Sequence, residues 1–474
     1  MKITSNKLKP NLKKLTDLDE DPDEWAGSQR SFFSKGTPPL SKMLDKILEE
    51  KGEFLCSQPF IHMNIPTYGY ANICCCTSMS VKKHISEIGF NGIWNEPEFF
   101  NLRKEMVSGH KDRKRTLKTC SRCIQNEYYG FTSIRESYNK DLYKDPDAVE
   151  EWNRLIKHVK EKPDEKYPVP KIIHTTSLKV WGNFCNLQCI MCSPEDSSGV
   201  GKEQMELGEI TKEGIKYTTE ARTGRKVLWE PPLITVDDSF IDEFQYWDVI
   251  KKTRRLKLIG GETLLIKQNV QLIEKCVKMG WAKDKRLFIF TNNFGHPNME
   301  YIRDLLSNFE SVMYKCSLEF WGQKNNYIRF PSKWEEVYKN IKLMNELPNL
   351  QIGLTCTLNP LSIGYVNEIV EGQKEMNNEK PFFQNVVRPQ WFTLQSLPDD
   401  IRDFYLDRLY NTGYAIIEKC EKAIHSLEKR EFIFSRYEEM IKRIIARDKF
   451  RNDNILKYLP EWKPHFQHDP YYND

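Results

Sequence analysis

The sequence has no long hydrophobic run. No stretch of its 474 residues approaches the ~18 consecutive apolar residues that a transmembrane helix needs. Residues 1–25 also lack the apolar segment of a secretory signal. These absences predict a cytoplasmic protein without a membrane partner, in which thiols stay reduced.

The sequence also has little net charge. Its 71 Lys and Arg residues nearly balance 67 Asp and Glu residues, which leaves a formal charge of +4. A surface of this kind lacks the broad basic field that nucleic acid attracts, so nucleic acid is not the expected partner. Hydrophobic residues make up 39% and aromatic residues 12% of the chain, enough for a large core.

Cysteine is the residue whose arrangement stands out. Of the 13 cysteines, nine fall into three groups: Cys56 with Cys74, Cys75 and Cys76; Cys120 with Cys123; and Cys185, Cys189 and Cys192. Clustered thiols in a reducing compartment indicate a metal site rather than disulfides. The other four are isolated in apolar or helical settings, where cysteine behaves as a small core side chain: Cys276, Cys316, Cys356 and Cys420.

The region 171–397 alternates short apolar runs with helical patterns. The runs are SLKVWG, RLKLIG, RLFIFT, SVMYKCSLEF, LQIGLTCTL and VVRPQWFTL, and helices are expected at 267–278, 299–306, 332–345 and 363–376. Alternation of this kind produces parallel βαβ units with right-handed crossovers. The sequence therefore predicts an α/β fold, a partial (β/α)6 TIM-like barrel with its site at the carboxyl ends of the strands.

Other segments flank this barrel. Residues 1–50 are predicted to form a mobile leader and a short helix at 40–51, and residues 51–165 a small α+β cysteine-rich module. Within that module we expect a β-hairpin in PFIHMNIPTYGYANICCCTS, helices at 96–107 and 149–160, and a knuckle closed by Cys120 and Cys123. A Pro-rich linker at 162–171 marks the boundary, 193–250 is a polar insertion, and 398–474 is a C-terminal extension of two charged amphipathic helices and a tail.

The three-cysteine loop follows the first expected barrel strand. Cys185, Cys189 and Cys192 can hold one corner of a [4Fe–4S] cluster, and three thiolates leave one of its four irons without a protein ligand. A zinc knuckle is the alternative, but it needs a fourth Cys or His at matched spacing, and none follows within forty residues.

The sequence CNLQCIMC, preceded by the aromatic Phe184, resembles the CxxxCxxC signature of the radical S-adenosylmethionine superfamily. The resemblance implies that the open iron binds the amino and carboxylate groups of S-adenosylmethionine. It also implies that one electron, from a donor such as flavodoxin or ferredoxin, cleaves the sulfonium to give a 5′-deoxyadenosyl radical that abstracts hydrogen from a substrate.

Two strand-end motifs strengthen this resemblance. Gly260, Gly261 and Glu262 resemble the family's GGE motif, which meets the methionine amino group, although Thr263 stands where proline often follows. A carboxylate suits an ammonium group, and glycines let the backbone approach a ligand. Asn293 ends a turn, Thr291-Asn292-Asn293, that looks like the family's TNG-type turn.

A third strand end carries Ser317 and Glu319, which resemble the family's Ser-x-Glu pair at the ribose and carboxylate. Arg329 follows and is a candidate partner for the methionine carboxylate, with a solvated surface arginine as the alternative. Asn359 at the end of the fifth strand is explained equally well as a turn-former.

The N-terminal cysteines resemble the SPASM/twitch auxiliary-cluster module, in which a cysteine, a Gly-centred hairpin and a CC pair precede CxxC. The resemblance implies a second [4Fe–4S] cluster held by Cys56, Cys120, Cys123 and one cysteine of the triplet. The spacing from Gly69 favours Cys74, whereas the CC-Ser/Thr ending favours Cys75 or Cys76. A zinc site remains the alternative, and the module precedes the barrel here although it usually follows it.

Together these features predict an oxidoreductase of the radical S-adenosylmethionine type, and they favour a peptide or protein side chain as its substrate. A substrate in cofactor or nucleotide metabolism is an alternative. A non-catalytic iron–sulfur redox or scaffold protein is another, but it would not need Glu262, Ser317 or Arg329.

Overall fold

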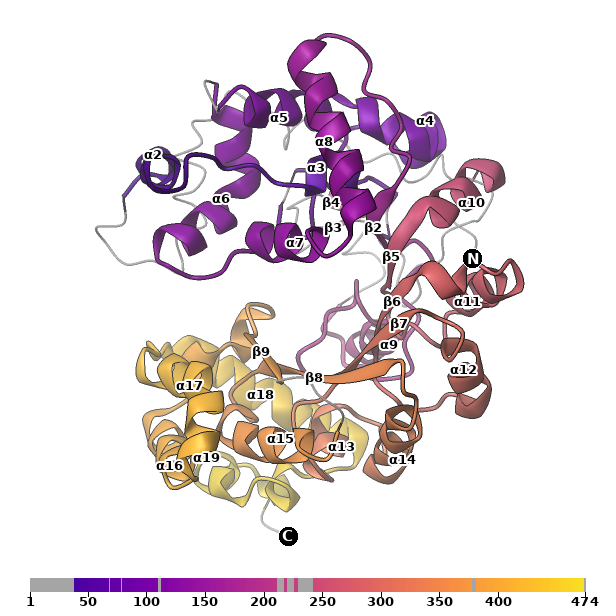
Figure 1. Cartoon of the computed structure of the whole chain (residues 1–474). Helices are drawn as coiled ribbons and strands as arrows, with labels where there is room; N and C mark the ends of the chain where they lie inside the picture. The colour runs from indigo at the N-terminus through magenta and orange to yellow at the C-terminus, as the bar shows by residue number, and fades with distance from the viewer. Residues whose placement is uncertain are drawn as a thin grey trace. The chain divides into compact units, whose positions relative to one another are not determined.

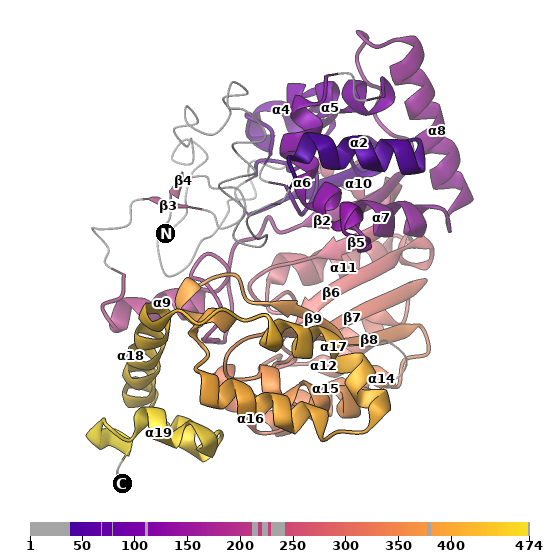
Figure 2. The same ribbon diagram turned by 90° about the vertical axis from the view of Figure 1, so that its left-hand side faces the viewer.

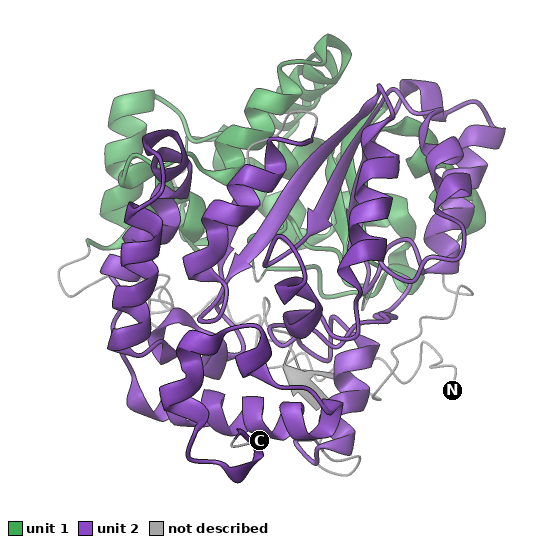
Figure 3. Ribbon diagram, turned by 90° about the horizontal axis from the view of Figure 1, so that it is seen from below, with its two compact units in different colours: residues 1–180, 217–228, 235–257 green, residues 181–216, 229–234, 258–474 purple. Residues whose placement is uncertain are grey.

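The computed structural model describes residues 38–67, 69–77, 79–109, 112–210, 217–219, 226–228, 242–376 and 381–472. The expected mobile leader, residues 1–37, and most of the second half of the 193–250 insertion lie outside these ranges. The chain divides into two compact units (Figure 3): Met1–Val180, Tyr217–Leu228 and Thr235–Lys257 form the first, and Trp181–Lys216, Trp229–Ile234 and Leu258–Asp474 form the second. No helix in the described ranges is long and apolar enough to cross a membrane.

The first unit is mostly helical. Its helices are α2 (Leu40–Lys51), α3 (Gln58–Ile61), α4 (Ile85–Gly92), η3 (Ile93–Asn95), α5 (Pro97–Val107), α6 (Lys114–Tyr128), α7 (Ile134–Leu142), α8 (Pro146–Glu161) and α10 (Glu243–Lys252). Its strands are β1 (His62–Ile65), β2 (Ile173–Leu178), β3 (Tyr217–Thr219), β4 (Lys226–Leu228) and β5 (Thr253–Leu258), of which Leu258 belongs to the second unit. The helices expected at 40–51, 96–107 and 149–160 are confirmed as α2, α5 and α8.

Helix α2 shows why this unit folds around its cysteines. Leu40, Met43, Leu44 and Ile47 recur at helical spacing and are all buried, so they form one apolar face. Gly52 ends the helix at φ 75°, a left-handed conformation in which its N–H donates to the Leu48 carbonyl. The apolar face packs with Leu117, Cys123 and Ile124 of α6, so the helix that carries two cysteines is anchored in the core.

Two local predictions for this unit are wrong. The expected hairpin is absent from the described part of 59–78, because β1 pairs in parallel with the distant β2, with His62 opposite Thr175, and only isolated bridges join Asn72 to Asn64 and Ser80. Alternation indicates a strand but does not choose its partner. The expected knuckle is instead part of the helix α6, on which Cys120 and Cys123 are one turn apart.

The second unit alternates strands and helices. Its strands are β6 (Arg286–Thr291), β7 (Ser311–Ser317), β8 (Leu350–Leu358) and β9 (Phe382–Asn385). Its α-helices are α9 (Ser198–Glu206), α11 (Lys267–Lys278), α12 (Met299–Leu306), α13 (Lys324–Ile328), α14 (Trp334–Asn345), α15 (Val366–Gln373), α16 (Asp399–Tyr410), α17 (Tyr414–Glu428), α18 (Phe434–Arg451) and α19 (Lys463–Phe466). Short 3-10 turns are η5 (Ala282–Asp284), η6 (Ile363–Tyr365), η7 (Gln390–Phe392), η8 (Leu394–Ser396), η9 (Ile455–Lys457), η10 (Pro460–Trp462) and η11 (Pro470–Tyr472).

The predicted mixed α/β class is confirmed. The strand order is β1-β2-β5-β6-β7-β8-β9, and β6 to β9 pair in parallel, each with the next. Figure 1 shows α11, α12 and α14 along one side of β6, β7 and β8. Because these strands are parallel, the turns that follow β6, β7 and β8 emerge at one edge, as in a partial barrel.

Several expected elements match closely, and two do not. The strands expected at 286–291 and 350–358 and the helices at 267–278 and 299–306 are confirmed residue for residue. The run VVRPQWFTL is not a strand, because β9 lies earlier at 382–385 and Pro389, which has no backbone N–H, precedes a 3-10 turn. The C-terminal region holds three long helices, α16, α17 and α18, rather than two (Figure 2).

Candidate metal centres

The loop that carries Cys185, Cys189 and Cys192 is fixed by backbone hydrogen bonds within the second unit. The Gln188 N–H donates to the Phe330 carbonyl at 2.7 Å, and the Ile190 N–H donates to the Ile328 carbonyl at 3.0 Å. A further bond of 3.0 Å runs from the Cys192 N–H to the Cys189 carbonyl. The loop is therefore held against the segment that carries Arg329.

The same loop touches the Gly260–Glu262 motif on its other side. The Glu262 N–H donates to the Phe184 carbonyl at 2.7 Å. A Cβ atom added to Gly261 would lie 2.2 Å from the Phe184 carbonyl oxygen and 2.4 Å from that of Asn183. Glycine at 261 is therefore required for the strand end to approach the backbone next to Cys185.

This close approach predicts different effects for the two glycines. Gly261→Ala should lower the free energy of unfolding by about 1–3 kcal/mol, because its methyl group meets rigid backbone. In Gly260→Ala the nearest atom is Cδ1 of Ile266, a side chain that can move, so the loss should be smaller. Chemical denaturation of both variants measures the difference, and equal losses would contradict this view of the contact.

Glu262 is buried and joins two strand ends. Its carboxylate accepts hydrogen bonds from the Thr291 hydroxyl and the Asn292 N–H, both at 2.7 Å, and from the Leu264 N–H at 3.2 Å. Burial raises the pKa of Glu262, and these three donors oppose that rise. The carboxylate thus positions the turn after β6 beside the cysteine loop.

The turn after β6 places one asparagine at the loop and one in the core. The Asn292 side-chain amide donates to Asn186 Oδ1 at 2.9 Å and lies 4.0 Å from the Cys185 sulfur. Asn293 adopts a φ of 60°, and its side chain accepts a 2.7 Å hydrogen bond from the Tyr314 hydroxyl. The structure therefore brings Asn292, which the sequence did not single out, closer to the cysteine loop than the predicted Asn293.

Arg329 and Glu319 form a buried ion pair next to Cys189. Arg329 donates through Nε and Nη2 to the two Glu319 oxygens, the second at 2.8 Å, and its Nη1 lies 3.7 Å from the Cys189 sulfur. Glu319 is fully buried and Arg329 is 9% exposed. The alternative of a solvated surface arginine is therefore wrong. Ser317, which ends β7, is half-buried.

The surroundings of these thiols suit a positively charged ligand. Burial, and then the Glu262 carboxylate, raise the pKa of Cys185, while the Leu187 N–H opposes the rise. Burial likewise raises the pKa of Cys189 to about 12, although the Arg329 charge favours the thiolate. Thiols in such surroundings ionise readily only when a metal replaces the proton.

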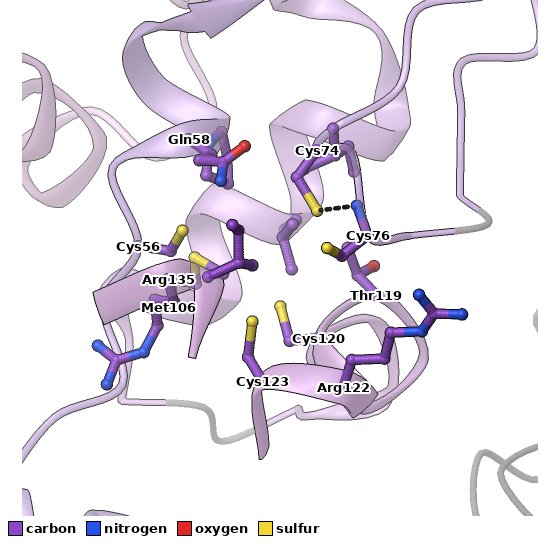
Figure 4. A pocket seen from close by; sticks show the side chains of 14 residues that line it. Cys56, Gln58, Cys74, Cys76, Met106, Thr119, Cys120, Arg122, Cys123 and Arg135 are labelled. Carbon is purple, nitrogen blue, oxygen red and sulfur yellow. Dashed lines mark hydrogen bonds between the residues drawn. The ribbon is translucent and has the colours of Figure 1, made fainter. Parts of the chain in front are cut away.

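The first unit gathers the other cysteines around one pocket. Figure 4 shows sulfur atoms from three segments of the chain facing a common space, and the cysteines that line it are Cys56, Cys74, Cys76, Cys120 and Cys123. Cys75 is not among the lining residues, and its sulfur lies 3.9 Å from that of Cys76. The pocket therefore favours Cys74 or Cys76 over Cys75 as a ligand.

Backbone N–H groups point at the sulfurs of this pocket. The Cys76 N–H donates to the Cys74 sulfur at 3.4 Å, drawn as a dashed line in Figure 4. Burial raises the pKa of Cys56 to about 12 and also raises that of Cys123, while N–H groups of Gln58 and Arg135 oppose these rises. N–H groups directed at sulfur stabilise thiolates, the form that binds metal.

An ion pair fixes the segments that meet at the pocket. Arg135 is bound to both oxygens of the buried Glu127 on α6, and its Nη1 donates to the Leu55 carbonyl at 2.9 Å. The Ser57 N–H donates to the Asn139 side chain at 3.0 Å. The segment around Cys56 is therefore held between α6 and α7.

The donor chemistry of both places fits iron–sulfur clusters. Within the described ranges, no three Cys, His, Asp or Glu side chains lie together as ligands of a single metal ion. The first place offers three thiols beside an arginine and the second offers five thiols around a shared space. Thiolates are the usual ligands of such clusters.

Comparisons with known proteins give only weak likenesses. No family model and no curated protein matches the chain. Among solved structures, Streptococcus suis SuiB bound to precursor peptide SuiA has a TM-score of 0.34 and 13% identity over 71% of this chain and 64% of that chain. The values are 0.33, 13%, 55% and 63% for anSMEcpe with bound AdoMet, and 0.25, 11%, 48% and 70% for TYW1 with a lysine-pyruvate adduct.

This chain thus spans less than two thirds of the length of SuiB and of anSMEcpe. TM-scores below 0.5 do not establish a shared fold. The interpretation of both metal centres therefore rests on the residues and contacts of this chain.

Proposed function

We propose that the protein is a radical S-adenosylmethionine enzyme. One observation carries the proposal: the CxxxCxxC loop is in backbone contact with Gly261 and Glu262 and lies beside Arg329, so the motifs of the resemblance are neighbours within one unit. Motifs that matched by chance would have no reason to meet.

In this proposal Cys185, Cys189 and Cys192 hold a [4Fe–4S] cluster. The bound cluster would supply the electron that cleaves S-adenosylmethionine. Arg329 provides a buried positive charge for the methionine carboxylate, and the end of β7 provides Ser317 and Glu319. Glu262 positions the turn after β6 and offers a carboxylate near the methionine ammonium.

We also propose a second [4Fe–4S] cluster, held by Cys56, Cys74, Cys120 and Cys123. Cys74 is preferred over Cys76 because it accepts an N–H bond from the residue two positions later, as Cys56 and Cys185 do. The buried Cys120 and Cys123 also lie close enough to interact electrostatically with Cys74.

The choice between the two cysteines has a direct test. Cys74→Ser should remove about four irons per chain, the content of one [4Fe–4S] cluster, whereas the matched variant Cys76→Ser should keep them. Iron and sulfide analysis of both reconstituted proteins measures the difference. Loss of iron from Cys76→Ser alone would reverse the assignment. Zinc in place of iron in the purified protein would contradict the second cluster.

For the substrate we favour a peptide or protein side chain, because the cysteine pocket resembles the auxiliary modules of peptide-modifying radical enzymes. A substrate in cofactor or nucleotide metabolism is the second candidate. Binding of S-adenosylmethionine by both classes is the same, so the distinction depends on product analysis.

Anaerobic reconstitution with iron and sulfide, reduction with dithionite and addition of S-adenosylmethionine test the proposal. We expect 5′-deoxyadenosine to appear, detected by chromatography and mass spectrometry. A protein loaded with both clusters that releases no cleavage product would refute the enzyme and leave the redox or scaffold alternative.

A further inference from the structure

A buried amide without a partner lines the cysteine pocket. Gln58 is 1% exposed, and neither its Oε1 nor its Nε2 has a hydrogen-bond partner among the residues that the structure describes. Figure 4 shows this side chain on the wall that it shares with the cysteines. An unpaired buried amide costs about 1–3 kcal/mol, so its position indicates a partner inside the pocket.

The main chain of Gln58 already serves the same pocket. Gln58 begins α3 two residues after Cys56, and its backbone N–H donates to the Cys56 sulfur. Backbone and side chain of one residue are thus directed to a thiol and to the space beside it. This local geometry fixes the amide next to whatever Cys56 binds.

Two other polar side chains on this wall have partners within the protein. The Thr119 hydroxyl donates to the Met79 sulfur at 3.3 Å. The Arg135 guanidinium is bound to Glu127 and to the Leu55 carbonyl. Gln58 differs from both because its two N–H donors have no acceptor in the described part of the chain.

We propose that the side-chain amide of Gln58 donates a hydrogen bond to the iron–sulfur cluster in this pocket and raises its reduction potential. The proposal rests on the second cluster of the proposed function. Cluster sulfurs accept hydrogen bonds but do not donate them, which selects Nε2 over Oε1 as the contacting atom. Reduction adds negative charge, so a donor stabilises the reduced cluster more than the oxidised one.

The experiment uses the full chain with Cys185, Cys189 and Cys192 all replaced by Ala, so that the pocket cluster is observed alone. Gln58→Leu in this background should shift the reduction equilibrium about tenfold toward the oxidised cluster, a potential lower by about 59 mV for one electron. The matched change Thr119→Val alters the same wall but should leave the potential unchanged. Redox titration followed by electron paramagnetic resonance measures all three proteins.

Equal potentials for Gln58→Leu and its parent, at equal iron content, would overturn the role of Gln58 while keeping the second cluster. A parent that binds no iron would overturn the second cluster itself. If Gln58→Leu fails to load, pulsed resonance on the parent with ¹⁵N only in glutamine side-chain amides decides the question. We expect a ¹⁵N coupling to the reduced cluster, and its absence would refute the hydrogen bond.

Discussion

Cys189→Ala is expected to reduce 5′-deoxyadenosine formation to background. Cys189 is one of only three thiols in its loop, it is buried, and Arg329 lies beside it. Loss of one of three ligands should release that cluster, so the iron content should fall by about four of about eight per chain. Product chromatography and iron analysis of the reconstituted protein measure both effects.

Cys276→Ala is the matched control. Cys276 is equally buried but lies on α11, outside both centres, so its replacement should keep all the iron and the cleavage activity. Cleavage that persists in Cys189→Ala would show that another site binds S-adenosylmethionine. Iron that falls to zero would show that the two centres do not load independently.

Arg329→Met should impair both stability and binding of S-adenosylmethionine. The change leaves the carboxylate of Glu319 buried without its partner, and breaking a buried ion pair in this way costs about 3–5 kcal/mol. It also removes the positive charge next to Cys189, so affinity for S-adenosylmethionine should fall about 10- to 100-fold. Chemical denaturation and equilibrium binding measure the two effects separately.

The double variant Arg329→Met with Glu319→Gln separates these roles. A neutral amide at position 319 no longer leaves a buried charge unpaired, so much of the lost stability should return. Affinity for S-adenosylmethionine should stay low, because the guanidinium is still missing. If affinity returned together with stability, Arg329 would act only by holding the fold, and its assignment to the methionine carboxylate would be wrong.

The sequence predicted the elements whose signals are local. Helices α11 and α12 and strands β6 and β8 have strong apolar periodicity, and their bounds agree with the structure. The partner of β1 was not predictable in this way, because His62 pairs with a residue more than one hundred positions away. Cys120 and Cys123 show a related limit, since a CxxC spacing fits a turn of helix as well as a knuckle.

The candidate sites show the same division. The sequence indicated Cys185, Glu262 and Arg329 because their motifs resemble a family, and the structure brings these segments into contact. Gln58 and Asn292 carried no such signal. The importance of Gln58 depends on burial without a partner, and that of Asn292 on its closeness to Cys185, so both emerge only from the packed chain.

The central claim is that one iron of the cluster at Cys185, Cys189 and Cys192 binds S-adenosylmethionine directly. The most direct measurement is pulsed resonance on the reduced protein with S-adenosylmethionine labelled by ¹⁵N in its amino group and ¹⁷O in its carboxylate. We predict hyperfine couplings from both labels in the wild type and in Cys120→Ala, which retains this cluster. A fully loaded wild-type protein without either coupling would contradict the claim.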